Sequence, residues 1–230
     1  QSLMQHYVPA YVRLAVDESY RVREHAAAAL AAFVRLLGRQ LAPHLRPLAA
    51  TWLCARHDPQ REVRHAAVAA FDAAFPTPIK YADALAFCAA SIVDGLSERV
   101  LARPPRAASD ADVEANARSV SSALCAASHP LATLSLKTPL PDAVGSFATA
   151  LGGDEVWELG RARSSPPAVR AALYTWAGAL LEHAHAQLSE RLQIRISALL
   201  LEGLSEREPS SQNAIGGPLL VAMRLGGPVA

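Results

Sequence analysis

The chain has 230 residues, and its 22 basic and 21 acidic residues give a formal net charge of +1. A chain so close to neutral is not held on nucleic acid by bulk charge alone. Hydrophobic residues make up 51% and charged residues 19% of the chain, a composition typical of a folded protein rather than a disordered one. The sequence contains no apolar run long enough for a membrane span, so we expect no contact with a membrane.

The cysteines and the chain ends give the next expectations. Cys54, Cys88 and Cys125 are odd in number and scattered, which does not favour a disulfide framework and favours a reducing, cytosolic compartment. The chain begins with Gln1 rather than Met, and its last residues resemble the middle of a chain. We therefore interpret the sequence as a fragment of a longer protein, in which the absence of a targeting signal carries little weight.

Alanine, leucine and arginine dominate the sequence, and all three favour helix. We therefore expect an all-α chain with almost no strand. Gly38 is expected to end the first helix, and Asp58 is expected to cap the third, with Pro59 at its first helical position. Prolines and small polar residues predict loops at 103–110 and 137–141. In chain order, the predicted helices are 21–37, 43–56, 58–75, 81–101, 112–136, 142–151, 155–163, 166–185, 189–204 and 212–224.

A short motif recurs at fixed internal spacing: an acidic or polar residue, four further residues, then Val-Arg followed by small and apolar residues. A period near 40 residues with two helices per unit is typical of HEAT and armadillo repeats. The predicted fold is therefore a curved α-solenoid, with residues 1–230 forming one segment of it. Two copies that lie 41 residues apart and a looser third supply the predicted repeat ladder: Asp17, Val22 and Arg23; Asp58, Val63 and Arg64; Ser164, Val169 and Arg170.

Each motif position has a physical role in such a stack. The Val fills the seam between repeats, the Asp caps the second helix of the pair, and the Arg can bridge to the Asp of its own or the neighbouring repeat. No helix pair buries its apolar face alone, so the units must stack. The alternative is an irregular all-α bundle, because the interval between the second and third copies requires two or more divergent repeats.

The sequence offers little catalytic or metal-binding chemistry. Cys54 and His57 are three residues apart and could face each other on one helical turn, but a nucleophile pair also needs an orienting group and an oxyanion site. A buried Cys beside a histidine at a helix end is the simpler interpretation. His183 and His185 point to different sides of a helix, and the chain has no Cys-x2-Cys pair. We predict no catalytic residue, cofactor or metal, and keep a hydrolase that uses Cys54 or a histidine as a remaining alternative.

Charge is uneven along the chain. Residues 1–64 hold nine Arg and five acidic residues, a net charge of +4, whereas the remainder carries −3. A basic N-terminal edge could face an RNA backbone. The alternative is a solvated helix surface with an Arg bias set by genome composition.

Several segments, in this order, resemble the N-terminal region of listerin, the RING-type E3 ubiquitin ligase of ribosome-associated quality control. The combination of RLAxDxxxxVRE, then LAPxL, then AFP is specific, because no general HEAT repeat needs it in that order. Residues 103–141 depart from the family pattern. The segments that carry the resemblance are Tyr11–Glu24, Leu41–Trp52, Phe71–Pro76, Ala84–Cys88, Asp154–Tyr174 and Gly217–Arg224.

The resemblance implies an anchoring role on the ribosome. Listerins form a long arc of HEAT/armadillo-like repeats that docks on the large ribosomal subunit after a stalled ribosome has split. The N-terminal domain lies near the partner that senses peptidyl-tRNA, and a distant C-terminal RING zinc finger ubiquitinates the nascent chain. This chain would bind rRNA and ribosomal proteins and join the remainder of its own protein. Arginines near element ends are the candidate contacts: Arg21, Arg35, Arg39, Arg61 and Arg103.

The competing interpretation is a general HEAT-repeat scaffold or adaptor that acts through protein partners. A ribosome anchor predicts binding that falls with salt, whereas an adaptor predicts binding insensitive to RNase.

Overall fold

The computed structural model describes residues 2–104, 107–135, 141–161 and 165–225. Within these ranges the regular structure is helical and contains no strand. Short 3₁₀ helices cover Gly38–His44, His185–Gln187 and Gly203–Ser205. The α-helices are α1 (Ser2–Leu14), α2 (Tyr20–Leu37), α3 (Leu45–Ala55), α4 (Arg61–Ala74), α5 (Pro78–Leu101), α6 (Asp110–Ser135), α7 (Pro141–Ala150), α8 (Asp154–Arg161), α9 (Pro167–Ala184), α10 (Glu190–Glu202) and α11 (Pro209–Arg224).

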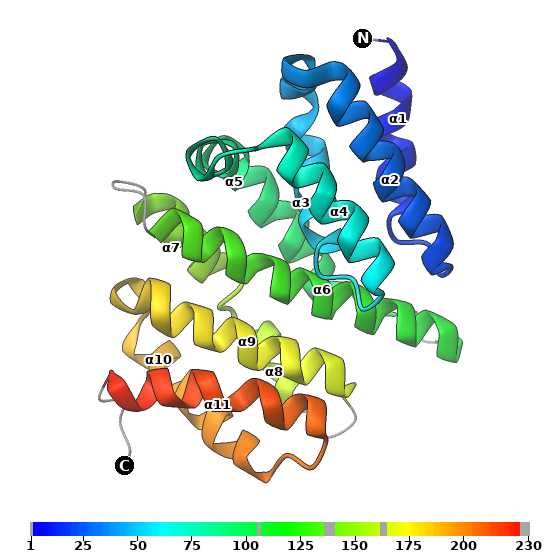
Figure 1. Cartoon of the computed structure of the whole chain (residues 1–230). Coiled ribbons are helices and arrows are strands. Elements are labelled where there is room, and N and C mark those ends of the chain that lie inside the picture. Colours follow the sequence, from blue (N-terminus) through cyan, green and yellow to red (C-terminus); the bar gives the residue numbers. More distant parts are fainter. Residues whose placement is uncertain (1, 105–106, 136–140, 162–164, 226–230) are drawn as a thin grey trace.

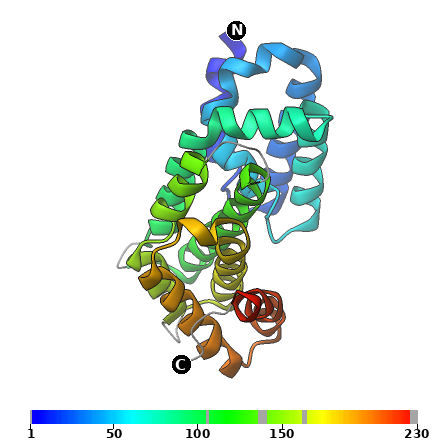
Figure 2. The same ribbon diagram turned by 90° about the vertical axis from the view of Figure 1, so that its left-hand side faces the viewer.

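The helices stack as antiparallel pairs into an elongated α-solenoid with the two chain ends at opposite ends of the stack (Figures 1 and 2). The second helices α2, α4, α6, α9 and α11 lie at the front in Figure 1, and most of the first helices lie behind them. α2 packs on α4, and α9 packs between α6 and α11. The prediction of an all-α helical-repeat solenoid is therefore confirmed.

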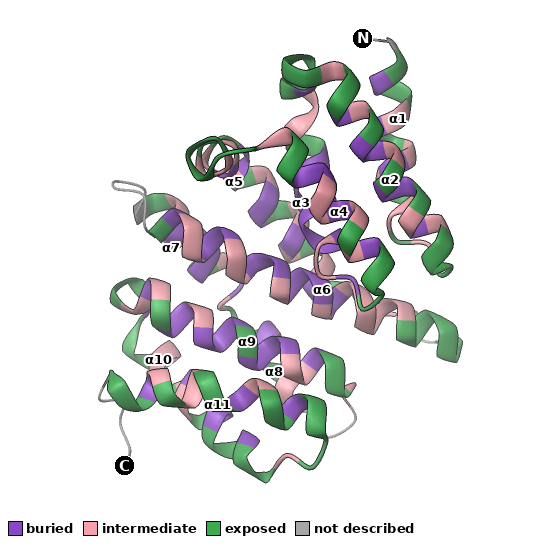
Figure 3. Ribbon diagram, in the orientation of Figure 1, coloured by how far each residue is buried: buried purple, intermediate pink, exposed green. Residues whose placement is uncertain are grey.

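The solenoid is held together by one continuous core of buried apolar side chains that runs from α1 to α11. Figure 3 shows the buried residues on the facing sides of the helices and the exposed ones on the outer sides and in the turns. The indole N–H groups of Trp52, Trp157 and Trp176 donate to backbone carbonyls. Each of these tryptophans is at most 1% exposed, so they pack helices together and offer no surface for stacking on a base.

The helix starts differ from the prediction in a consistent way. Asp17 and Asp58 do not cap α2 and α4, because the N-cap residues are Ser19 and Gln60. Each Asp lies two residues earlier, where its carboxylate accepts the backbone N–H of that N-cap residue at 2.9 Å. The aspartates therefore close the turn before the helix. The prediction of Asp58 as N-cap with Pro59 in the first turn is wrong, because α4 begins at Arg61.

Other boundaries also differ. The sequence reasoning missed α1, which contains Pro9 and so reads as an interrupted pattern. Pro78, which lies outside the predicted helices 58–75 and 81–101, begins α5 beside the Thr77 N-cap. Pro is tolerated in the first turn, where its missing N–H has no intrahelical partner.

The predicted loops and the third repeat fall partly outside the described residues. Between α5 and α6, residues 102–104 and 107–109 are not helical. Of the predicted loop 137–141, only Pro141 is described, and it is the first residue of α7. Ser164 of the third copy also lies outside the described residues.

The stack is irregular between the second and third helix pairs. α4 approaches α6 only at its N-terminal end and diverges from it toward its C-terminal end (Figure 1). Among the helices that precede α6, α5 and α3 supply most of the packing against it. The hydroxyl of Ser122 on α6 donates to the carbonyl of His57, in the turn before α4, at 3.1 Å. We call this meeting of α4, α6 and the His57 turn the junction. The interval between the second and third motif copies is long because α5, α6, α7 and α8 lie between α4 and α9.

Two histidines lie at the junction beside arginine. Burial first, and then the charges of Arg56, His129 and Arg64, lower the pKa of His57 to about 4. Burial and the charge of Arg56 lower the pKa of His129 to about 4. Both imidazoles are therefore neutral in the folded chain at neutral pH, whereas an unfolded histidine takes up a proton near pH 6.5.

We expect the chain to lose stability as the pH falls from 7 to 5. The unfolded state binds protons at His57 and His129 in this range and the folded state does not, so acidification favours unfolding. His129→Gln should make the dependence of the thermal midpoint on pH shallower, as measured by circular dichroism. His25→Gln, at an exposed position of α2, is the matched control. Identical slopes in wild type and both variants would contradict the assignment.

Candidate functional site

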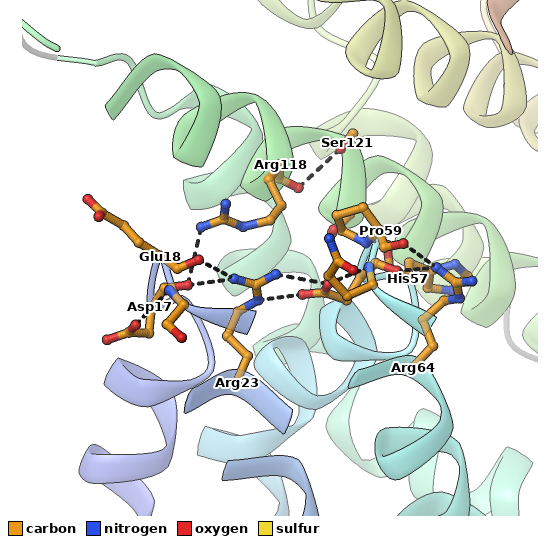
Figure 4. Close-up of polar contacts among 12 residues, drawn as sticks. Asp17, Glu18, Arg23, His57, Pro59, Arg64, Arg118 and Ser121 are labelled. Atoms are coloured by element: carbon orange, nitrogen blue, oxygen red, sulfur yellow. Dashed lines mark hydrogen bonds and ion pairs between the residues drawn. The ribbon is translucent and has the colours of Figure 1, made fainter. Parts of the chain in front are cut away.

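Charge pairs, one of them buried and one partly buried, join consecutive repeats on the edge where the second helices begin. The guanidinium of Arg23 on α2 pairs with the Asp58 carboxylate through two bonds, at 2.7 and 3.1 Å. Arg23 also donates to the carbonyls of Asp17 and Glu18, at 2.8 and 2.9 Å. Its side chain is 3% exposed and that of Asp58 7%. Arg23 thereby binds both the turn before its own helix and the turn of the next repeat (Figure 4).

The same pattern returns in the C-terminal half of the chain. Arg170 on α9 pairs with Glu206, at 2.6 and 3.0 Å, and donates to the Ser165 carbonyl. The Glu206 carboxylate accepts the backbone N–H groups of Arg207 and Glu208, at 2.9 and 3.2 Å. These bonds, the Arg170 bond first, lower the pKa of Glu206 to about 2. Glu206 therefore binds the arginine of the preceding repeat and closes the turn before α11, as Asp58 does before α4.

The pairing identifies a repeat that the sequence analysis missed. Gln212 on α11 donates to the Glu206 carbonyl at 2.6 Å, just as Arg64 donates to the Asp58 carbonyl at 2.7 Å. Ser211, at the position of the motif Val, is fully buried and donates to the Pro167 carbonyl. The available signal was an acidic residue 35 positions after Arg23 and 36 positions after Arg170, a spacing that Arg64 does not share.

The ladder is interrupted at the junction. The Nη1 group of Arg64 donates to the carbonyls of its own turn, Asp58 and Pro59, and within the described residues it meets no carboxylate of a following repeat. On α6, Arg118 donates to the Asp17 carbonyl at 3.3 Å instead. α6 is thereby fixed to the turns of both preceding pairs (Figure 4).

The three motif valines next to these charges differ in burial. Val63 and Val169 are buried at 1% and 3% exposure, whereas Val22 is half-buried. The ladder residues thus lie mainly inside the stack and serve to hold it together.

The five candidate binding arginines are all exposed, but they do not form one cluster. Arg21 and Arg61 lie in the first turns of α2 and α4, on the right-hand edge in Figure 1. Arg103 follows α5 and donates to nearby carbonyls. Arg35 and Arg39 lie at the other end of α2, about 20 Å from Arg21 by helical rise.

Cys54 and His57 do not form a nucleophile pair. Cys54 is 7% exposed, and burial raises the pKa of its thiol to about 11. The thiolate is the reactive form of cysteine, and at neutral pH this thiol keeps its proton. The structure therefore offers no support for a hydrolase that uses Cys54.

The described ranges hold no group of three or more metal-ligating side chains. None of the helices within them combines the length and the apolar character required to cross a membrane.

The Arg23–Asp58 pair should contribute strongly to stability. Asp58→Asn keeps the shape of the side chain and leaves a buried guanidinium without its counter-charge, so we expect a loss of about 3 kcal/mol in the free energy of unfolding, measured by denaturant titration. Asp17→Asn is the matched control: Asp17 makes the same turn contact, and no ion pair joins it to a described residue. Its loss should be about 0.5 kcal/mol or less; equal losses would contradict the ladder.

Among curated proteins, the chain is similar to listerins of several vertebrates. The E3 ubiquitin-protein ligase listerin of Mus musculus is 26% identical over 215 residues, which cover 91% of this chain and 12% of that protein. Listerin of Xenopus tropicalis is 33% identical over 110 residues, covering 48% of this chain and 6% of that protein. The chain therefore spans a small part of the length of these relatives. No solved structure matches it.

The family comparison covers nearly the whole chain. The family model described as the N-terminal domain of the E3 ubiquitin-protein ligase listerin matches residues 1–224. This range includes both halves of the ladder and the junction between them. The chain therefore belongs to the listerin N-terminal domain family.

Proposed function

We propose that this chain is the N-terminal anchoring module of a listerin-like E3 ubiquitin ligase, which binds the stalled large ribosomal subunit and positions a distant RING to ubiquitinate nascent chains. The observation that carries the proposal is the family match over residues 1–224. The ligase activity itself belongs to the proposal, because the chain spans 12% of the length of mouse listerin.

The shape of the chain supports an anchoring role. A single core extends through the stack, so the chain transmits position from one end to the other. Holding a remote catalytic module near its target raises the effective concentration of that module without any new contact at the reaction site.

The proposal includes the setting of the module. Residues 1–230 form one solenoid segment of a longer cytosolic protein, and the RING zinc finger lies in another part of that protein. The partners are the rRNA and proteins of the large ribosomal subunit and the quality-control factor that senses peptidyl-tRNA. No cofactor enters the role of this segment.

Exposed arginines at helix ends are the proposed contacts with the RNA backbone. Arg21 and Arg61 lie on the edge where α2 and α4 begin, with Arg103 after α5. Arg35 and Arg39 lie at the opposite end of α2. The two groups are separate surfaces, so variants of each group can show which one meets the ribosome.

Charge reversal at Arg35, Arg39 and Arg61 should weaken co-sedimentation of the chain with large ribosomal subunits about tenfold, because each reversal removes a contact with a phosphate. The loss of these contacts should also make the remaining binding less dependent on salt. Two double variants then show which group of arginines contacts the ribosome: Arg21→Glu with Arg61→Glu, and Arg35→Glu with Arg39→Glu. Arg191→Glu with Arg224→Glu reverses the same charge on exposed residues of the C-terminal half and should leave binding unchanged.

Circular dichroism verifies that each variant is folded. Binding that is unchanged in the triple variant, or that is insensitive to salt and to RNase, would remove the basic-edge proposal and favour an adaptor that binds protein partners.

A further inference from the structure

The divergence of α4 from α6 opens a groove of about 540 Å³ on the C-terminal side of the junction. We call it the junction groove. Its volume lies in the range of ordinary ligand sites. The lining residues that matter here are Arg56, Asp72, Phe75, Tyr81, His129 and Thr133.

A half-buried cation lies at the base of the groove. The Arg56 guanidinium lies 4.7 Å from the Phe71 ring centroid and 5.7 Å from that of Tyr81, and it donates to the Tyr81 hydroxyl at 3.1 Å. Within the described ranges no ion pair joins Arg56 to a carboxylate, whereas the guanidinium of Arg23 pairs with Asp58. The ring contacts and one neutral acceptor hold Arg56 in place and leave its charge uncompensated.

The groups around Arg56 supply neutral imidazole and apolar surface rather than a counter-charge. The His129 ring lies 5.3 Å from the Tyr81 ring, and Arg56 lowers the pKa of both His129 and His57. The aromatic rings of the wall are packed on one another, with Phe75 and Tyr81 6.2 Å apart. Among the described residues that line the groove, Asp72 alone carries a carboxylate, and it is exposed at the rim.

We propose that the junction groove binds a short acidic–apolar segment of a partner protein, in which one carboxylate side chain pairs with Arg56 and the flanking apolar side chains cover the aromatic wall. A guanidinium and a carboxylate form strong charge-assisted bonds, and partial burial strengthens them.

Nucleic acid fits the groove less well than such a segment. An RNA strand needs a series of cations along its phosphates and free aromatic faces for its bases. The described residues of the groove present one arginine, rings already packed together, and a carboxylate at the rim that repels phosphate.

The test uses an array of acetylated, amidated octapeptides with a central Glu flanked by Phe, Leu or Pro, each beside its Gln twin, and measures binding to the 230-residue chain. Hits are measured again by fluorescence anisotropy. At least one Glu peptide should bind tenfold or more tightly than its Gln twin, and decauridine RNA should not displace it. The proposal is overturned if no Glu peptide exceeds its twin, or if decauridine RNA displaces the peptide and binds in an Arg56-dependent way.

Variants locate the binding in the groove. Arg56→Gln should abolish the difference between the twins, and Arg56→Lys should retain part of it. Asp72→Asn should tighten the Glu peptide severalfold, because a repelling charge is removed from the rim. Arg224→Gln, at an exposed position on α11 outside the groove, should leave the affinity for both peptides unchanged. A Glu preference that survives Arg56→Gln overturns the proposal.

Two further readouts hold even if Arg56→Gln does not fold. Asp72 is exposed, and equal affinity of Asp72→Asn and wild type for the Glu peptide overturns the proposal. A bound carboxylate favours the protonated imidazole, so an NMR titration should show the pKa of His129 rising with the Glu peptide and not with its Gln twin; an unchanged value also overturns it.

Discussion

A helix pair has too little interior to cover its own apolar faces, and every other feature of this chain follows from that constraint. The pairs bury those faces only against one another, so the core runs through the whole stack. Apolar contact is nondirectional, however, and does not by itself fix how one pair is placed on the next. The Arg23–Asp58 and Arg170–Glu206 pairs supply that direction, since each joins the start of one second helix to the turn before the next.

These pairs are costly to form, because a guanidinium and a carboxylate must leave water together. The structure satisfies the remaining hydrogen-bonding groups with backbone. Arg23 donates to two carbonyls of its own turn, and Asp58 accepts a backbone N–H. The pair thereby specifies register within the stack, in addition to any stability it contributes.

The junction shows what happens where the ladder stops. Arg64 keeps the bonds to its own turn and has no described carboxylate ahead of it, and α4 diverges from α6. The divergence exposes Arg56 and its aromatic surroundings at the base of a groove. An irregularity in the repeat therefore produces the part of the chain with the most distinctive chemistry, while the regular repeats serve as its support.

The sequence by itself determined the helical class, the repeat period and the family, because helix propensity, motif spacing and residue identity are local properties that survive without coordinates. It also indicated that a motif Arg meets an Asp. It missed Glu206 and Gln212, because they occupy ladder positions without sharing the motif letters. It predicted Asp58 as the N-cap of α4, whereas Asp58 closes the turn before that helix. A cap and a turn-closing carboxylate have the same sequence signature. Only the tertiary structure decided which residues meet across the junction, because contact between Arg56, Tyr81 and His129 depends on the angle between helices far apart in the chain.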